Sequence, residues 1–206
     1  KYLEALRIFV AREGEWSPNA AGLSMNIGSI YQKQGRLDDA LRMYKRALRV
    51  FRRGLGDGHR RVPYALSSVA DCLRNKGQLE RAMAKFEEAH AILVGLYGED
   101  HEEVAQVIVS MAFVLRDQGK GAEAIAMQEN AVDIHRRTLG SDHDRVASLL
   151  LNLGVSYCDG GMLDEALARF EEGLGIVRRI HPERNATEAV ILVNMGIVCS
   201  RQGKLE

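Results

Sequence analysis

The stretch Gly35-Arg36-Leu37-Asp38-Asp39-Ala40 decides the fold, because it returns along the chain at a constant spacing. Its glycine recurs four times, and each copy stands 42 residues after the one before it: Gly77, Gly119, Gly161 and Gly203. Self-similarity at such a period indicates an array of supersecondary units, each of which buries its apolar face against its neighbours. The sequence therefore predicts a repeat protein.

Each repeat contains two predicted helices. One of them, which we call helix B, is marked by apolar residues at steps of three and four: Leu37, Ala40, Leu41, Tyr44, Leu48, Phe51 and Leu55. Gly56 ends this helix, and the following helix A runs roughly from residue 62 to 75 and ends before Gly77. The short connections on both sides predict that A and B form an antiparallel hairpin. In later repeats, Asp100 and Asp142 are the predicted N-caps of helix A.

Small and large side chains alternate with the same period. The pattern reads Gly28, Tyr31, Ala40, Tyr44, Ala47, then Ala70, Leu73, Ala82, Phe86, Ala89, and later Gly154, Tyr157, Ala166, Phe170, Gly173. It resembles the tetratricopeptide repeat, in which small residues let helices approach and large ones fill the space beside them. The 42-residue spacing, with Leu139-Gly140-Ser141-Asp142-His143 between helices, is similar to the repeats of kinesin light chains.

The resemblance implies an all-α fold, a right-handed superhelical solenoid of antiparallel helix hairpins with helix A on its concave surface and helix B on its convex one. It also implies a protein-interaction module or scaffold that binds a peptide or partner helix in the concave groove.

The chain departs from two known ligand-binding patterns of the family, and both departures affect which ligand is expected. Kinesin light chains tend to carry asparagine where this chain has Met25, Ser67, Val109, Leu151 and Val193, and only the next position keeps amides, at Asn26, Asn152 and Asn194. The carboxylate clamp of chaperone-binding domains is not matched at Met25 and Ser29, which disfavours chaperone tails as ligands.

Residues 1–206 are expected to form a single solenoid fragment. The predicted units are a partial repeat at 1–20, full repeats at about 21–62, 63–104, 105–146 and 147–188, and a partial repeat at 189–206. Ala5, Leu6 and Phe9 match Ala40, Leu41 and Tyr44 at an offset of 35, which makes the first link shorter than the others. Neither end resembles a polar capping repeat, so we expect a piece of a longer array whose end helices expose apolar faces and self-associate.

Composition narrows the functional classes. The chain has 28 basic and 28 acidic side chains, so no overall charge draws it to nucleic acid or to an anionic membrane. Its apolar runs are too short to span a bilayer, so no membrane insertion is expected. The three cysteines lack a CxxC pair and are interpreted as reduced thiols, which favours a cytoplasmic location with a cytoskeletal association as an option.

No motif for an enzyme is found, and no cofactor or metal is expected. His59, His101 and His143 occupy equivalent loops one repeat apart. Packed helices stand about 8–10 Å apart, whereas zinc ligands lie within about 2.0–2.3 Å of the ion, so the histidines are predicted to structure the loops instead. Asp164 and Glu165 open a helix B, where acids meet the positive end of the helix dipole.

The third repeat is irregular. Gly121 stands where Leu37, Leu79 and Leu163 stand, and Gln128 replaces the aromatic residue of the other repeats. Loss of a buried side chain of this size costs about 2–5 kcal/mol when the space is not refilled. The sequence favours a tolerated weak link, with a hinge or a surface completed by a partner as alternatives.

Two sets of residues are candidates for partner binding. The first is a basic patch on a convex helix B: Arg42, Lys45, Arg46, Arg49, Arg52 and Arg53. At the positions of Lys45 and Arg46, later B helices carry Glu87 and Glu88, Glu129 and Asn130, and Glu171 and Glu172. Neighbouring B helices are therefore predicted to pair charges, with an acidic protein surface or a tubulin-like tail as the alternative partner. Specific nucleic-acid binding is disfavoured, since no aromatic residues accompany the arginines.

The second set lines the concave groove that the family geometry implies. It consists of the polar residues Asp71 and Arg74 followed by a mostly apolar stripe: Val109, Phe113, Arg116, Leu151, Val155, Val193 and Ile197. Such a stripe suits a peptide with spaced apolar anchors, with Phe113 as the expected hot spot; the alternative is that a segment of the same protein covers it. The rival functions are a structural array in a large assembly, cytoskeletal or ciliary, and a regulatory array attached to an enzyme.

Overall fold

The computed structural model describes residues 1–183 and 185–203, and all regular elements in these ranges are α-helices. Their bounds are α1 Tyr2–Glu13, α2 Pro18–Lys33, α3 Leu37–Leu55, α4 Arg61–Asn75, α5 Leu79–Tyr97, α6 Glu102–Asp117, α7 Gly121–Leu139, α8 Asp144–Asp159, α9 Leu163–Ile180 and α10 Ala186–Arg201. The even-numbered helices from α2 to α10 are the predicted A helices, and the odd-numbered ones are B helices.

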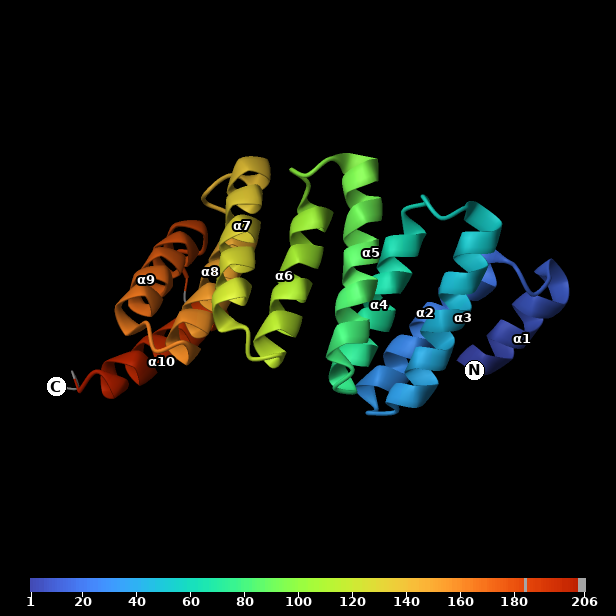
Figure 1. The fold of residues 1–206 in the computed structure, drawn as a ribbon, viewed down its shortest axis with the longest axis horizontal. Helices are drawn as coiled ribbons and strands as arrows, with labels where there is room; N and C mark the ends of the chain where they lie inside the picture. Colours follow the sequence, from blue (N-terminus) through green and yellow to red (C-terminus); the bar gives the residue numbers. More distant parts are fainter. Residues whose placement is uncertain (184, 204–206) are drawn as a thin grey trace. The chain divides into compact units, whose positions relative to one another are not determined.

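The helices belong to two compact units, Lys1–Gly98 and Glu99–Glu206. Within the first, α2 pairs with α3 and α4 pairs with α5; within the second, α6 pairs with α7 and α8 with α9 (Figure 1). Each pair is an antiparallel hairpin, which confirms the all-α class and the hairpin repeat. The right-handed superhelical path and the single solenoid stay predictions.

Small residues hold each hairpin together where the sequence pattern placed them. A Cβ atom added to Gly28 on α2 would stand 2.6 Å from Cε1 of Tyr44 on α3, and one added to Gly154 on α8 would stand 2.5 Å from Cε1 of Phe170 on α9. Aromatic rings therefore occupy the space that a methyl group would take. This contact is the physical basis of the small–large alternation.

The turns of each hairpin depend on glycine. Gly35 has a φ of 74°, and the N–H of Arg36 just beyond it donates to the carbonyl of Tyr31 at 2.9 Å. Gly56 ends α3 with a φ of 87°, and its N–H donates to the carbonyl of Arg52 at 3.0 Å. Positive φ is accessible to glycine at little cost, which explains why the repeat is read most clearly from its glycines.

The predicted N-caps were wrong by one residue. His101 and His143, not Asp100 and Asp142, precede α6 and α8 with extended backbone, and their Nδ1 atoms accept from the N–H groups of Glu103 at 3.2 Å and Arg145 at 3.1 Å. The aspartates instead accept from arginines at the far end of the partner helix B. These ion pairs join the open ends of the α6–α7 and α8–α9 hairpins: Arg137 with Asp100 at 2.6 Å and Arg179 with Asp142 at 2.5 Å.

The register predicted for the first helix was also wrong. Gly14 ends α1 with a φ of 89°, and its N–H donates to the carbonyl of Val10, as the N–H of Gly56 does to that of Arg52. Gly14 and Gly56 are 42 residues apart, so α1 is equivalent to the second half of α3 and Leu6 corresponds to Leu48. Apolar residues at steps of three and four match a helix in several registers, whereas the terminal glycine fixes one.

The irregular third repeat is filled and not left open. Gln128 on α7 is only 2% exposed, and neither its amide oxygen nor its amide nitrogen has a hydrogen-bond partner among the described residues. Two turns further along α7, His135 is buried as well, and its Nδ1 lies 3.1 Å from the carbonyl of Ala131. A partner therefore has no access to Gln128. A buried amide without hydrogen bonds costs stability, so its burial favours the interpretation of the third repeat as a tolerated weak link.

Candidate protein-interaction surfaces

A cleft of 660 Å³ opens in the first unit between α1, α2, α3 and α4. We call it the aromatic cleft. Its lining consists of Phe9, Pro18, Asn19, Gly22, Leu23, Met25, Asn26, Phe51, Arg61 and Tyr64. Residues from two A helices and two B helices thus enclose one space. The cleft therefore requires α1 and α4 to be packed beside the α2–α3 hairpin.

Aromatic side chains dominate this cleft. Tyr64 is 65% exposed and Phe9 is 38% exposed, while Phe51 is buried. The guanidinium of Arg61 lies 5.7 Å from the centre of the Phe51 ring, within the range of a cation–π contact. No acidic residue is among the described residues of the lining, which offer apolar surface with one cation and two amides.

None of the lining residues of this cleft was predicted as a site residue, and Met25 and Asn26 entered only through the comparison with kinesin light chains. Tyr64 was missed because it lies in the first turn of α4, before Asp71 and Arg74, the two residues of this helix that were assigned to the groove. Phe9 was missed because α1 was read in the wrong register. The available signal for a binding site was an aromatic residue, Tyr64, in the first turn of a predicted A helix.

Asp71 and Arg74, the polar part of the predicted groove, lie on α4 and are half-buried. Burial raises the pKa of the Asp71 carboxyl, and the neighbouring Arg74 opposes this shift. The nearby Tyr44 has its pKa raised by burial to about 12. Its hydroxyl stays protonated and donates to Oε1 of Gln32 at 2.8 Å, which ties α3 to α2 behind the predicted groove.

In the second unit the predicted apolar stripe is only partly open. Val109 on α6 is 3% exposed, so its assignment to an open surface was wrong: it packs into the core. Phe113 is half-buried, with the Arg116 guanidinium 5.1 Å from its ring centre, and Leu151 and Val155 are half-buried on α8. Val193 and Ile197 on α10 are the most open, with 63% and 46% of their surface exposed.

The outer faces of the B helices pair charges, as predicted. Arg52 on α3 binds Glu88 on α5, and Arg136 on α7 binds Glu172 on α9. Burial opposes ionisation of Glu88, but the hydrogen bond from Lys85 and the charge of Arg52 outweigh it and hold the pKa of the carboxyl below its usual value. Both pairs are partly exposed, so each contributes only about 0–1 kcal/mol.

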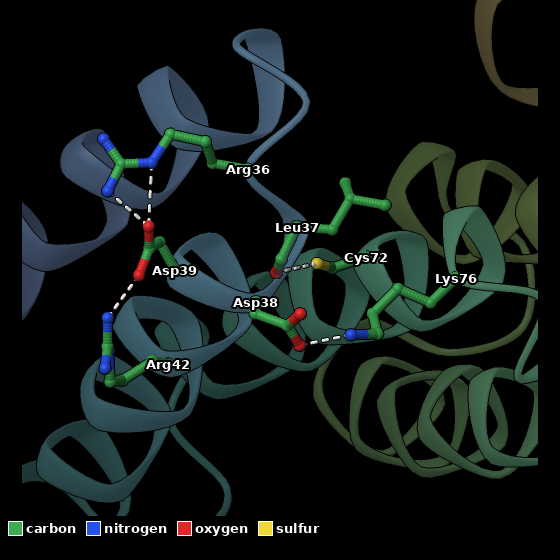
Figure 2. Close-up of polar contacts among 7 residues, drawn as sticks. All are labelled: Arg36, Leu37, Asp38, Asp39, Arg42, Cys72 and Lys76. Carbon is green, nitrogen blue, oxygen red and sulfur yellow. Dashed lines mark hydrogen bonds and ion pairs between the residues drawn. The ribbon is translucent and has the colours of Figure 1, made fainter.

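The basic patch divides into two groups. Arg42 forms an ion pair with Asp39, which also binds Arg36 (Figure 2). Arg52 forms an ion pair with Glu88. The guanidinium of Arg53 lies 4.0 Å from the centre of the Trp16 ring. Lys45, Arg46 and Arg49 form no ion pair with any residue that the structure describes. Half of the patch therefore serves the fold, and the other half faces solvent.

The loop histidines have the structural role that was predicted for them. Nδ1 of His59 accepts from the N–H of Arg61 at 3.2 Å, as His101 and His143 do in their own loops. Among the described residues, no group of three or more His, Cys, Asp or Glu side chains is placed to hold a metal ion. None of the described helices has the length and apolar character needed to cross a membrane.

Comparisons with known proteins agree with this architecture. The sequence model of the tetratricopeptide repeat family matches residues 19–93, 103–179 and 145–206. No curated protein matches the chain. The solved structure of BtubC (BKLC) from P. vanneervenii is similar, with a TM-score of 0.81, 23% identity, and coverage of 98% of this chain and 80% of that one. The repeats of a putative kinesin light chain from Podosopora anserina give a TM-score of 0.78 at 18% identity, over 91% of this chain and 89% of theirs.

Proposed function

Because the chain belongs to the tetratricopeptide repeat family, whose domains generally bind other proteins, we propose that it holds a peptide segment or helix of a partner on the faces of its A helices. The observation that carries the proposal is the aromatic cleft, which leaves Tyr64 and Phe9 open to solvent beside a cation. Exposed aromatic side chains around a concave surface are typical of peptide-binding sites, since they supply contact area at low entropic cost.

The lining of the cleft favours one kind of ligand. The exposed rings of Tyr64 and Phe9 favour a ligand side chain that is large and apolar, and the amides of Asn19 and Asn26 offer hydrogen bonds to the ligand backbone. Arg61 favours a ligand carboxylate nearby. In the second unit, Phe113, Val155 and Ile197 offer further apolar positions on A helices, with Phe113 as the proposed anchor point. The free cysteines favour a cytoplasmic setting for this interaction.

A selection experiment tests the proposal. A library of random peptides displayed on phage is panned against the whole chain, and the affinity of an enriched peptide is measured by titration. The substitution Tyr64→Asp should weaken binding by more than tenfold, about 1.4 kcal/mol, because it places a charge in the apolar wall. Leu96→Asp, at an exposed apolar residue of α5 outside the cleft, is the matched control and should leave affinity within twofold.

Two results would contradict the proposal. The first is that no peptide is enriched over a bare-support control. The second is that Tyr64→Asp binds the enriched peptides as well as the wild type does, while circular dichroism shows an intact helical fold. Either result would remove the cleft as a peptide site.

A second candidate function, a structural array that assembles through its own helices, is favoured by a separate observation. Ile8 on α1 and Val190 and Leu192 on α10 are exposed apolar residues outside the cleft. Apolar patches of this kind promote association. Light scattering distinguishes the two functions, since only assembly changes the mass of the protein with its own concentration.

A further inference from the structure

The outer face of the first unit carries a groove that the proposed function does not use. It consists of two adjoining hollows, which share Glu15 and Arg46 in their linings. One, of 470 Å³, is lined by α3 and by Glu15 of the loop after α1, and the other, of 510 Å³, lies between α1 and α3. One hollow is edged by a row of cations on α3: Arg42, Lys45, Arg46 and Arg49. The other has apolar walls made by Leu6, Val10 and Met43. We call the two together the basic groove.

The positive charge of this groove is not neutralised within the described part of the chain. Its two acidic lining residues are Glu15 and Asp38, and Asp38 is bound to Lys76 of α4 (Figure 2). Lys45, Arg46 and Arg49 form no ion pair with a described residue, and neither does Arg7 on the opposite wall. Only Arg42 has an acidic partner, Asp39, which it shares with Arg36. An anionic ligand would therefore meet several uncommitted cations.

The basic row is a property of α3 and not of the repeat. One period later the same four positions on α5 hold Ala84, Glu87, Glu88 and Ala91, and on α9 they hold Ala168, Glu171, Glu172 and Gly175. Like charges three and four residues apart repel one another and destabilise a helix. Because Lys45, Arg46 and Arg49 form no ion pair with a described residue, and Glu15 is one carboxylate beside several cations, the row is better explained by something that binds to it than by the stability of the fold.

We propose that the basic groove binds an acidic segment of a partner protein. Its carboxylates meet the row from Arg42 to Arg49, and a neighbouring aliphatic side chain enters the hollow formed by Leu6, Val10 and Met43. The row spans about 10 Å along the helix axis, which matches about three residues of an extended chain. The fold already contains one such contact, since Arg52 on the same helix binds Glu88 of α5.

The lining favours a protein segment over a nucleic acid. No aromatic side chain is among the described residues that line either hollow, so this part of the lining gives bases nothing to stack on. An apolar hollow directly beside the cations suits a peptide that alternates acidic and aliphatic residues. A nucleic acid would leave that hollow empty.

Charge reversal in the whole chain tests the proposal. The probe is a fluorescein-labelled peptide of about twelve residues that repeats Glu-Glu-Leu, and its binding is followed by anisotropy at low salt. The double substitution Lys45→Glu with Arg46→Glu should weaken binding more than tenfold. It reproduces the Glu87-Glu88 pair of α5, so the outer face of the fold accommodates it. The control pair Lys33→Glu with Arg60→Glu makes the same charge change at exposed residues outside both hollows and should stay within threefold of the wild type.

Two further measurements separate the acidic and apolar parts. Met43→Ala should weaken the Glu-Glu-Leu peptide about threefold and leave a Glu-Glu-Ser peptide unchanged, since only leucine reaches the apolar hollow. A Gln-Gln-Leu peptide should not bind.

Any of four results would overturn the proposal: no binding of the Glu-Glu-Leu peptide at millimolar protein, equal loss in the two charge-reversed variants, equal binding of the Gln-Gln-Leu peptide, or tighter binding of oligo-dT of the same length. The last would assign the row to nucleic acid. Tyr64 lies outside the groove, so these results are independent of the aromatic cleft.

Discussion

Gly154 faces the ring of Phe170 so closely that a Cβ atom there would stand 2.5 Å from Cε1 of the ring. The contact joins α8 to α9 in the hairpin, and the pair Gly28 and Tyr44 repeats it between α2 and α3. In the second repeat Ala70 and Phe86 occupy the same positions, and both are fully buried. The crossing of A and B is therefore set by how much space a small residue leaves for a large ring.

Gly154→Ala should destabilise the protein although alanine is the better helix former. Overpacking a core typically costs about 1–3 kcal/mol, and replacing a helical glycine by alanine returns about 0.5–1 kcal/mol, so we expect a net loss of about 0–2.5 kcal/mol. Gly196→Ala on α10, where nothing lies within 4 Å of the added Cβ, is the matched control and should stabilise. Urea unfolding of both variants checks the prediction; equal gains in stability would contradict the contact.

Gln128→Phe should stabilise the protein. The substitution restores the aromatic residue of the other repeats and removes two buried polar atoms that have no described partner. Leaving such a group buried and unsatisfied costs about 1–3 kcal/mol, and the small residue opposite, Ala112, is the type that accommodates Phe86 from Ala70. The exposed Gln106→Phe is the control. A loss of stability in Gln128→Phe alone would mean that the third repeat is packed differently.

The stability of the protein should fall as the pH is lowered through about 6.5, the ordinary pKa of histidine. Burial lowers the pKa of His135, Arg145 and His143 lower it further, and Glu102 and the bond to Ala131 oppose them. The unfolded chain therefore takes up a proton at His135 before the folded one does, so acid favours unfolding. His135→Leu, which copies Leu93 of the second repeat, should reduce this pH dependence. Unfolding free energies at about pH 8 and pH 5 provide the test; an unchanged difference between the two pH values would contradict it.

The protein should associate with itself at high concentration. Val190 and Leu192 leave apolar surface open on α10, as Ile8 does on α1, and association removes such surface from water. Light scattering over a concentration series should show a rising average mass that Val190→Asp with Leu192→Asp reduces. A strict monomer at every concentration, with terminal amides protected from exchange, would rule association out.

Much of this architecture could be predicted from the sequence, because its determinants are local. The spacing of Leu37, Tyr44 and Phe51 fixes a helix and its buried face, and Gly35 and Gly56 fix where the chain turns. The N-caps of α6 and α8 were not predicted correctly, because the side chains of aspartate and histidine can both accept a hydrogen bond from a helix N-terminus. Only the backbone geometry decides between Asp100 and His101. Val109 was placed on an open surface for a similar reason: its helix position is clear, but its burial depends on neighbours that are distant in sequence.

The candidate sites were harder to predict than the fold. The aromatic cleft depends on Phe9 of α1 and Tyr64 of α4 lining the same space, which no local pattern encodes. The basic row was visible as a charge run, but its division into paired and unpaired residues was not. Arg52 and Lys45 have similar charges and lie on the same helix, yet only Arg52 is reached by a carboxylate of α5.

Phe113→Asp tests the proposed peptide surface of the second unit. If Phe113 is an anchor point, the affinity for a peptide selected on the whole chain should fall more than tenfold, about 1.4 kcal/mol, while circular dichroism shows an intact fold. Gln106→Asp, at an exposed position on the same helix, is the control. Unchanged affinity in Phe113→Asp would restrict the peptide site to the first unit.

The central claim is that partners bind on the A helices, and photo-crosslinking tests it most directly. A selected peptide carrying a benzophenone at its apolar anchor is irradiated with the whole chain, and the modified residues are identified by mass spectrometry. We predict crosslinks to residues of the aromatic cleft on α2 and α4, above all near Tyr64, and their loss in Tyr64→Asp. Crosslinks confined to the outer faces of α3, α5, α7 and α9 would contradict the account.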